Sequence, residues 1–584
     1  MWGFAVQETL LAIDTENYLS SAAERPSFDA VPETESSLRP YIPALITSAL
    51  ALEACGGSSA APTTVAPTPV VVAPTPPPAP VVLTSAQSSR LLAQASFGAT
   101  TAEIAMVTSL GVPGWITDQA TKARTKHWDW LVANGYNVAT NINNTAGFDN
   151  SVWRSIITEP GQLRQRVGMA LSQMMVIGVD GVNLQWKQFA GAAWLDILLD
   201  NALGNFRTLV EQITLCPAMG SYLTYINNRR ANGSAVPDEN YAREVMQLFT
   251  LGVNRLNMDG TVQLSGGQPV ETYTLNDVSQ LARVFTGLQL DSTDTTTPDR
   301  LRRPLVMNAS LHEPGASTFL GITVPAATEG LAAVRIALDG IFAHPNVPPF
   351  VSKQLIQRLV TSNPSPAFVL RVSTIFADNG SGVRGDLLAV VRAILTDTEA
   401  RGPASLTATT SGKLREPVMR LTSWARGFSA ASPGGLWAIG DTTSANNRLA
   451  QSLGRSPSVF NFFRPGYSPP NTALSTASLV APEFQITNEL SVVSYLNFMQ
   501  TLIVNGIGDV RANYTDILTK AADSGALVDE VNTLLAAGQL GAATVTSIRA
   551  AVDSIATTTT TGPINRVYTA ILLTMAAPDF ITQK

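Results

Sequence analysis

The sequence predicts a mainly α-helical protein, with one large multi-helix domain over residues 84–584 behind a disordered tether. Apolar residues recur with helical spacing through most of the chain after residue 83, and strand signals are sparse. Of the 584 residues, 45% are apolar and only 14% are charged, against about 25% charged in typical soluble domains. Such a chain can bury a large core.

Residues 1–55 have the character of a leader region. Arg39 supplies a positive charge, and Tyr41–Leu52 form an apolar stretch that is too short to span a bilayer but suits the core of an export signal. The upstream residues 1–38 are acidic and polar, whereas a bacterial signal normally sits at the very start of the chain. We therefore expect that translation starts downstream of residue 38.

The apolar stretch ends in "LEAC", which resembles a bacterial lipobox. In a lipobox the cysteine, here Cys55, is lipidated and becomes the first mature residue; Glu53 departs from the small residue usual at its position. The alternative is a short amphipathic segment with a free thiol. The lipobox predicts an exported protein held to the cell envelope by a lipid anchor. Gly56 and Gly57 give no aspartate retention signal, which favours the outer membrane.

Residues 56–83 form a linker rich in proline, threonine and alanine. Ser58–Val82 carry no charged side chain, and this composition favours extended polyproline-like conformers that act as a semi-rigid spacer. A tether between a lipid anchor and a folded domain needs that behaviour.

Two capping boxes mark helix starts in the folded part. Thr100 stands three residues before Glu103, and the apolar period that follows stops at Gly111. Thr274 stands three residues before Asp277, and Gly287 ends that helix. The second helix is expected to bury one face, made of Leu275, Val278, Leu281 and Phe285.

Three further segments complete the expected domain. Leu163–Gly178 are apolar nearly all round after Arg166, which predicts a central buried helix. Asp259-Gly260 is a turn signature and predicts a small β-hairpin inserted between helices. The polar stretch at 291–304 is a possible seam between an N-terminal and a C-terminal half.

The composition argues against several function classes. A net charge of -6 disfavours a broad nucleic-acid-binding face. Two cysteines and three scattered histidines exclude a thiolate zinc site and a disulfide framework, and we expect no metal and no cofactor. No Gly-x-Ser-x-Gly elbow or phosphate-cradling glycine loop accompanies the histidines.

Several long strings resemble, in order, the domain-of-unknown-function 1800 family from about residue 86 to the C-terminus. They are "SRLLAQASFGATTAEI", "LRQRVGMALSQMMVIG", "LGNFRTLVEQITLCPAMGSYL", "PDENYAREVMQLFTLGVNRLN", "YTLNDVSQLARVFTGL" and "SPSVFNFFRPGYSPP" with "LVAPEFQITNE". The resemblance implies a bacterial, exported protein with an undivided large domain. It also implies a possible exported partner that looks like a sulfatase, because such proteins are often encoded beside this family. The family has no established activity, so the resemblance supplies no catalytic residues. Cys216 departs from it by standing where a histidine is expected.

The stretch Pro237–Gly252, "PDENYAREVMQLFTLG", is the strongest candidate site. On a helical wheel Glu239, Asn240, Arg243 and Glu244 lie on the polar side. Much of this concentration of polar and charged residues has a purely structural explanation: a helix start, and an ion pair between Glu239 and Arg243 four residues apart. The functional alternative requires the polar face to be covered by another element.

Arginines elsewhere could supply that cover. Arg164 or Arg166, at the start of the expected buried helix, would need a carboxylate, because an unpaired buried charge is costly; Glu244 or Glu239 could supply it. Asn205, Arg207 and Arg464 lie in loop-like Asn/Arg/aromatic mixtures that suit carboxylate, sulfate or sugar binding. The alternative is that these arginines cap helix ends and pack their stems.

Two functions remain open. A binding or assembly role in the cell envelope is favoured. The alternative is a carboxylate-based hydrolase or lyase acting on an anionic or glycan substrate, with Glu244 as the acid and base. An enzyme predicts that Glu244, Arg243, Asn205 and Arg464 line one cleft. The aromatic segment "FNFFRPGYSPP" either forms a lip over a groove or simply covers the core.

Overall fold

The computed structural model describes residues 82–584, which belong to a single compact unit. The predicted export signal, the lipidated Cys55 and nearly all of the tether lie outside the described residues. Helices dominate the described part, and its strands form only two-stranded sheets, which confirms the mainly α fold class. Among the described residues, no helix is long and apolar enough to cross a membrane.

Eight α-helices form the first part of this unit. They are α1 (Ser85–Ala95), α2 (Thr101–Ala120), α3 (His127–Ala133), α4 (Phe148–Thr158), α5 (Gln162–Ser172), α6 (Lys187–Asn201), α7 (Phe206–Thr214) and α8 (Pro217–Tyr222). The short helices η1 (Ala139–Asn141) and η2 (Val179–Gly181) lie between them.

The predicted start of α2 is confirmed, but its end is not. The Thr100 hydroxyl accepts a hydrogen bond from the backbone N–H of Glu103 at 3.1 Å. Gly111 leaves the helical region at φ 66°, yet the helix resumes and runs to Ala120. Gly111 is therefore a kink, because Pro113 follows closely and its fixed φ suits the first turn of a new helical segment.

Helix α5 is the predicted central buried helix, but it ends at Ser172 and does not run to Gly178. Ten of its eleven residues are buried, all but Arg164. A Cβ atom on Gly168 would lie 2.4 Å from the Leu199 side chain, so this glycine lets α5 approach α6 closely. Tight packing here fixes the position of α6, which lines a cleft of about 970 Å³.

The middle of the unit holds the predicted hairpin. It follows α9 (Asn240–Glu244) and the π-helix η3 (Val245–Thr250), and it precedes α10 (Leu275–Val284). Gly260 has φ 75° in the Asp259-Gly260 turn, and Leu256 and Val262 form a bridge across it. The insertion continues into a second turn, where β1 (Leu264–Ser265) pairs with β2 (Gln268–Pro269).

Three other two-stranded sheets are present among the described residues. They pair β3 (Leu288–Gln289) with β4 (Val306–Met307), β5 (Ser317–Phe319) with β6 (Ile322–Val324), and β7 (Lys413–Leu414) with β8 (Thr582–Gln583). The last sheet ties the C-terminus to the middle of the chain, and the Arg90 Nε–H of α1 donates to the Lys584 carbonyl at 3.1 Å.

The capping box of α10 is confirmed, and its buried face is confirmed in part. Thr274 accepts from the Asp277 N–H at 3.2 Å, and its own N–H donates to the Asp277 carboxylate at 2.7 Å. Val278, Leu281 and Phe285 are buried, but Leu275 is 73% exposed. Leu275 lies at the edge of the apolar stripe on a helical wheel, so the core does not reach it.

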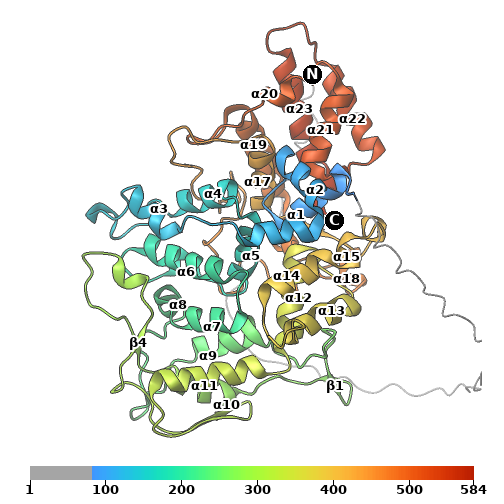
Figure 1. The fold of residues 1–584 in the computed structure, drawn as a ribbon. Helices are drawn as coiled ribbons and strands as arrows, with labels where there is room; N and C mark the ends of the chain where they lie inside the picture. The colour runs from blue at the N-terminus through green and yellow to red at the C-terminus, as the bar shows by residue number, and fades with distance from the viewer. Residues whose placement is uncertain (1–81) are drawn as a thin grey trace, which may run out of the picture. The chain divides into compact units, whose positions relative to one another are not determined.

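The remaining helices follow the middle segment. They are η4 (Asp299–Leu301), α11 (Gly330–Ala343), α12 (Val347–Leu359), α13 (Pro366–Ala377), α14 (Leu387–Thr396), α15 (Thr398–Arg401), α16 (Ala404–Thr407), α17 (Pro417–Gly427), α18 (Ala473–Thr476), η5 (Pro482–Ile486), α19 (Glu489–Asn505), α20 (Thr515–Leu518), α21 (Ser524–Ala536), α22 (Ala542–Asp553), α23 (Gly562–Ala576) and α24 (Pro578–Ile581). Figure 1 shows α20–α23 together at one end of the unit and α9–α11 at the other.

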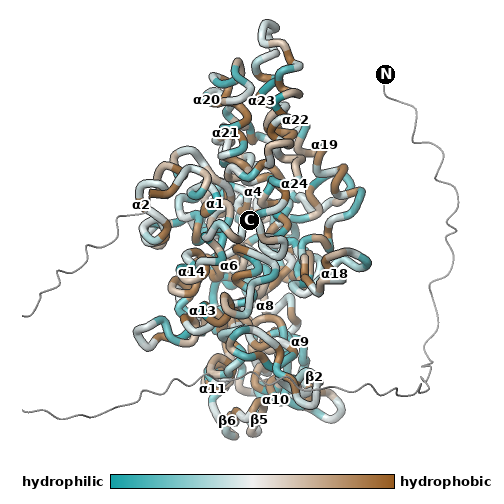
Figure 2. The backbone as a smooth tube through the Cα atoms, turned by 90° about the vertical axis from the view of Figure 1, so that its right-hand side faces the viewer, coloured by the Kyte–Doolittle hydropathy of each residue, from teal (hydrophilic) through white to brown (hydrophobic). Residues whose placement is uncertain are grey.

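Helices from distant parts of the chain share one core. Helix α5 packs on α12 and α2 packs on α14, across the stretch 291–304 where the sequence predicts a possible seam. In Figure 2 hydrophobic and hydrophilic residues alternate along the helices, as amphipathic helices around a common core require. Nearly all of the buried hydrophobic residues form one contiguous cluster from α1 to α24.

Candidate functional site

The predicted helix pair at the start of the Pro237–Gly252 stretch is confirmed. The Arg243 guanidinium lies 3.1 Å from the Glu239 carboxylate, and both side chains are more than one-third exposed. The other oxygen of Glu239 accepts a hydrogen bond from the Ser279 hydroxyl of α10. These two residues therefore join α9 to α10 at the surface.

Asn240 and Glu244 differ in how far the fold satisfies them. The Asn240 side chain donates to the Thr224 hydroxyl at 2.8 Å. Glu244 has one buried carboxylate oxygen with no hydrogen-bond partner among the described residues. Burial raises the pKa of Glu244, and nearby Arg243 only partly offsets that effect.

The expected contact between this stretch and the buried helix is absent from the described residues. Arg164 donates to the Leu199 carbonyl at 3.1 Å instead. Arg166 donates to the Arg358 carbonyl, and its charge lies near Glu416 and Glu483. The prediction that Glu244 or Glu239 pairs with one of these arginines is wrong, because α5 presents Arg164 to carbonyls of α2 and α6 and presents Arg166 to α12.

Asn205 and Arg464 contact residues other than Glu244. Asn205 is the N-cap of α7: its oxygen accepts from the Arg207 N–H at 2.9 Å, and its amide donates to the Arg384 carbonyl at 2.8 Å. The Arg464 guanidinium stacks over the Phe460 ring at 4.7 Å. The structure therefore does not bring these predicted residues into one cleft.

Of the predicted residues, Arg207 alone lines a cleft that has a volume of about 970 Å³. The cleft lies among α3, α6, α7, the start of α8, the loop after η4, and α11. Its apolar lining consists of Trp128, Ala193, Ile197, Leu215, Cys216, Pro217, Leu301 and Pro304. Its charged lining consists of Lys126, Asp129, Asp196, Asp200, Arg207, Glu211, Arg302, Arg303, Arg335 and Asp339.

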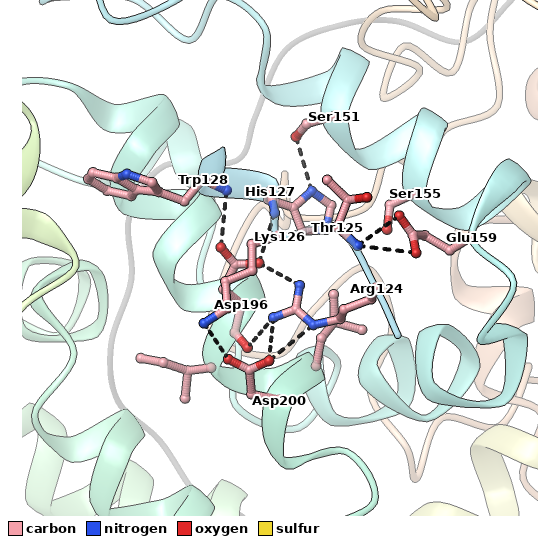
Figure 3. A network of polar contacts seen from close by, with 12 residues as sticks. Arg124, Thr125, Lys126, His127, Trp128, Ser151, Ser155, Glu159, Asp196 and Asp200 are labelled. Carbon is pink, nitrogen blue, oxygen red and sulfur yellow. Dashed lines mark hydrogen bonds and ion pairs between the residues drawn. The ribbon is translucent and has the colours of Figure 1, made fainter. Parts of the chain in front are cut away.

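Asp196 of α6 holds the wall formed by the start of α3. Its carboxylate accepts from the backbone N–H groups of His127 at 2.9 Å and Trp128 at 3.0 Å, and from Arg124 at 2.8 Å. Arg124 also pairs with Asp200 at 2.7 Å. Figure 3 shows this network from close by. A buried carboxylate at a helix N-terminus satisfies N–H groups that would otherwise lack partners.

His127 belongs to this wall and not to a catalytic set. Its ring is buried, and its Nδ1 lies 3.1 Å from the Ser151 hydroxyl (Figure 3). Burial, with the charges of Arg124 and Arg154, holds the pKa of His127 well below its usual range. The imidazole is therefore neutral at pH 7, and it does not face the cleft lining.

Arg207 links the opposite wall. It donates to Glu211 at 2.8 Å and to Asp339 of α11 at 2.7 Å, while Arg335 donates to the other oxygen of Glu211 at 3.0 Å. Burial alone would raise the pKa of Glu211, but the hydrogen bonds from Arg335 and Arg207 outweigh it and lower the pKa. Glu211 is thus a fixed anion between two arginines.

The mouth of the cleft carries three half-exposed arginines, Arg302, Arg303 and Arg335, which we call the cleft rim. Arg302 lies over the Trp128 ring at 5.1 Å from the ring centre, and Trp128 is only 4% exposed. Each rim arginine bonds one carboxylate: Asp299, Asp291 and Glu211, respectively. Guanidinium N–H groups remain for a ligand.

Cys216 lies in the cleft lining as an inert group. It is buried, and burial raises the pKa of its thiol to about 11. The thiol is therefore protonated at neutral pH and is a weak nucleophile. Four of the five lining carboxylates are ion-paired, and Asp129 alone is not paired among the described residues. This arrangement suits binding better than acid–base catalysis.

Most cleft residues could not be predicted from the sequence. Four separate segments contribute Lys126, Trp128, Asp196 and the rim arginines. Long-range packing of the helices brings these segments together. One local signal was present: Arg302 and Arg303 form an adjacent pair of cations in a polar loop, a composition typical of binding loops.

Comparison with known proteins gives a family. The model of the family described as "Protein of unknown function (DUF1800)" matches residues 90–582. The chain belongs to this family. The matched range includes every residue of the cleft lining. No curated protein and no solved structure matches the chain.

Proposed function

We propose that this member of the family is an exported, lipid-anchored protein of the cell envelope that binds an anionic ligand in the cleft. The observation that carries this proposal is the cleft rim: three half-exposed guanidinium groups over an apolar floor in a cleft of about 970 Å³. Guanidinium groups recognise carboxylate and sulfate in a bidentate manner. The lipobox-like Cys55 and the tether support the anchor.

An acidic glycan is the ligand class that this lining favours. Sugar rings present flat apolar faces that can rest on the accessible apolar lining at Ile197, Leu215 and Pro304, while acid groups pair with Arg302 and Arg303. We further propose that an exported sulfatase-like protein is the partner, because a protein that holds acidic glycans would present them to such an enzyme.

The test measures binding of a uronic-acid oligosaccharide to the purified protein by calorimetry. The double variant Arg302→Gln/Arg303→Gln should weaken binding at least tenfold, because two charge-assisted contacts are lost. The matched control is Arg229→Gln/Arg230→Gln, an adjacent pair of exposed arginines outside the cleft lining. Equal binding by the two double variants, or equal binding of a neutral oligosaccharide, would overturn the proposal.

A carboxylate-based hydrolase or lyase is the second candidate. The raised pKa of Glu244 and its unpartnered buried oxygen favour it, since a general acid must hold its proton near neutral pH. Glu244 lies outside the cleft lining, which is why binding is the leading proposal. Cleavage of the oligosaccharide by the wild type but not by Glu244→Gln would reverse this order.

A further inference from the structure

A second cavity of about 410 Å³ lies beside α12, away from the cleft. Three parts of the chain that are distant in sequence form it: the loop at 251–262, α12 with residues 362–364 just after it, and the loops at 465–466 and 478–480. Pro465 and Gly466 come from the aromatic segment that the sequence suggested as a lip over a groove. The segment does form part of a cavity wall.

The walls of this cavity are mostly apolar and are held open by the protein itself. Leu256, Phe350, Pro465 and Val480 contribute hydrophobic surface. Asn363 fixes one wall, because its amide exchanges two hydrogen bonds of 2.9 Å with the backbone of Val480. The cavity is therefore preformed, as small-molecule sites usually are.

Lys353 is the one ionisable group in the lining. Its ammonium donates to the Gly260 carbonyl at 3.4 Å, a long contact, and it forms no ion pair with any described residue. Burial lowers the pKa of Lys353, and Asp259 only partly offsets this. The amide group of Gln357 donates to the Ser362 carbonyl at 3.0 Å, so this donor is already engaged within the protein. A part-buried ammonium beside an apolar cavity thus has no direct ion-pair partner among the described residues, because Asp259 acts on it only at longer range.

We propose that this cavity binds an alkyl carboxylate, whose acid group pairs with Lys353 and whose chain lies against Phe350 and the apolar wall. One cation matches one negative charge. A phosphate would bring up to two charges and would need further donors, whereas no arginine and no second lysine lines the cavity. A neutral apolar molecule would leave the ammonium without a partner.

The first test measures the rate at which each lysine of the full chain is acylated, by mass spectrometry. The rates are compared with and without octanoate, which is the ligand added. Octanoate should slow acylation of Lys353 at least fivefold. Lys187 is the internal control, because it is also part-buried and its ammonium donates to a backbone carbonyl, that of Asp180, at 3.2 Å. Lys187 lies outside the cavity lining, so its acylation should not change. Equal acylation of Lys353 with and without octanoate would overturn the proposal.

The second test measures octanoate affinity by calorimetry. Lys353→Met keeps the apolar stem and removes the charge, so affinity should fall at least tenfold, whereas Lys187→Met should bind as the wild type does. Octanamide, the uncharged twin of octanoate, should bind at least tenfold more weakly to the wild type. Octanamide binding as tightly as octanoate, or full affinity in Lys353→Met, would contradict the proposal. The Arg302→Gln/Arg303→Gln variant should keep full octanoate affinity, which separates this site from the cleft.

Discussion

The cleft rim and the interior of the unit use the same kinds of charged side chain in opposite ways. We call Arg166, Arg358, Lys413, Glu416 and Glu483 the interior cluster. Its five residues are at most 8% exposed, whereas the rim arginines are about half exposed. The rim arginines are accessible to a ligand, whereas the residues of the interior cluster contact only other parts of the protein.

Contacts within the interior cluster join segments that are far apart in sequence. The Lys413 ammonium lies 2.8 Å from Glu483 and 3.6 Å from Glu416, and it donates to the Arg358 carbonyl at 3.0 Å. Glu416 also accepts from Gln173 at 2.6 Å and from Gln451 at 2.7 Å. Density of charge in a sequence therefore does not reveal a functional site. What distinguishes the two regions is access to solvent and to a ligand.

The largest expected effect concerns the interior cluster. Glu416→Gln should lower the free energy of unfolding by about 3–5 kcal/mol, because removal of one partner leaves buried cations uncompensated. Glu416 is 1% exposed, so water cannot replace the lost charge. Chemical denaturation at pH 7 measures the change.

The matched variant at the cleft is Asp299→Asn, which removes the carboxylate that pairs with Arg302 at 2.8 Å. Both partners of this pair are exposed, so the expected loss is under about 1 kcal/mol. Similar losses in the two variants would mean that burial does not separate the two regions.

A medium effect is expected from His127, which is buried behind the cleft wall. Its pKa is held well below the usual range in the folded protein, whereas an unfolded histidine takes up a proton below about pH 6.5. The unfolded state therefore binds more protons, and stability should fall as the pH drops below about 6.5, by up to about 1.4 kcal/mol per pH unit.

The variant His127→Gln isolates this contribution. Denaturation of the wild type and the variant at pH 7.5 and pH 5.5 gives the difference, in which the titration of all other groups cancels. The wild type should lose more stability than the variant between these two pH values. A parallel loss in both proteins would show that His127 is protonated in the folded state or is accessible to water.

Local features of the fold were predictable from the sequence, and convergent ones were not. The caps at Thr100 and Thr274 and the Asp259-Gly260 turn depend on neighbouring residues alone, so short patterns identify them. The buried character of α5 follows from its composition. The π-helix η3 has no such signature, and it follows Glu244 directly. π-helical turns often occur at functional sites, which is one more reason to test Glu244.

Of the residues that the sequence analysis proposed for a site, only Arg207 lies in the cleft lining. The prediction favoured a stretch with dense local charge, but Glu239 and Arg243 satisfy each other at the surface. The cleft instead combines Asp196, Arg302 and Arg335 from three separate segments. Convergence of this kind depends on how helices pack, and no periodicity in a single segment encodes it.

The smallest expected effect extends the comparison to that surface pair. Glu239→Gln removes the partner of Arg243 at an exposed i, i+4 position, so the free energy of unfolding should fall by only about 0.3–0.5 kcal/mol at low salt. The difference should shrink further in 0.5 M salt, because exposed charges are screened. Thermal denaturation in both buffers measures it. A loss above about 2 kcal/mol would place Glu239 with the interior cluster and would mean that another element covers this face. A small, salt-sensitive loss of unfolding free energy would mean that the charged residues of Pro237–Gly252 mainly stabilise the helix. Glu244 would then be the one charged residue of this stretch whose role is unexplained.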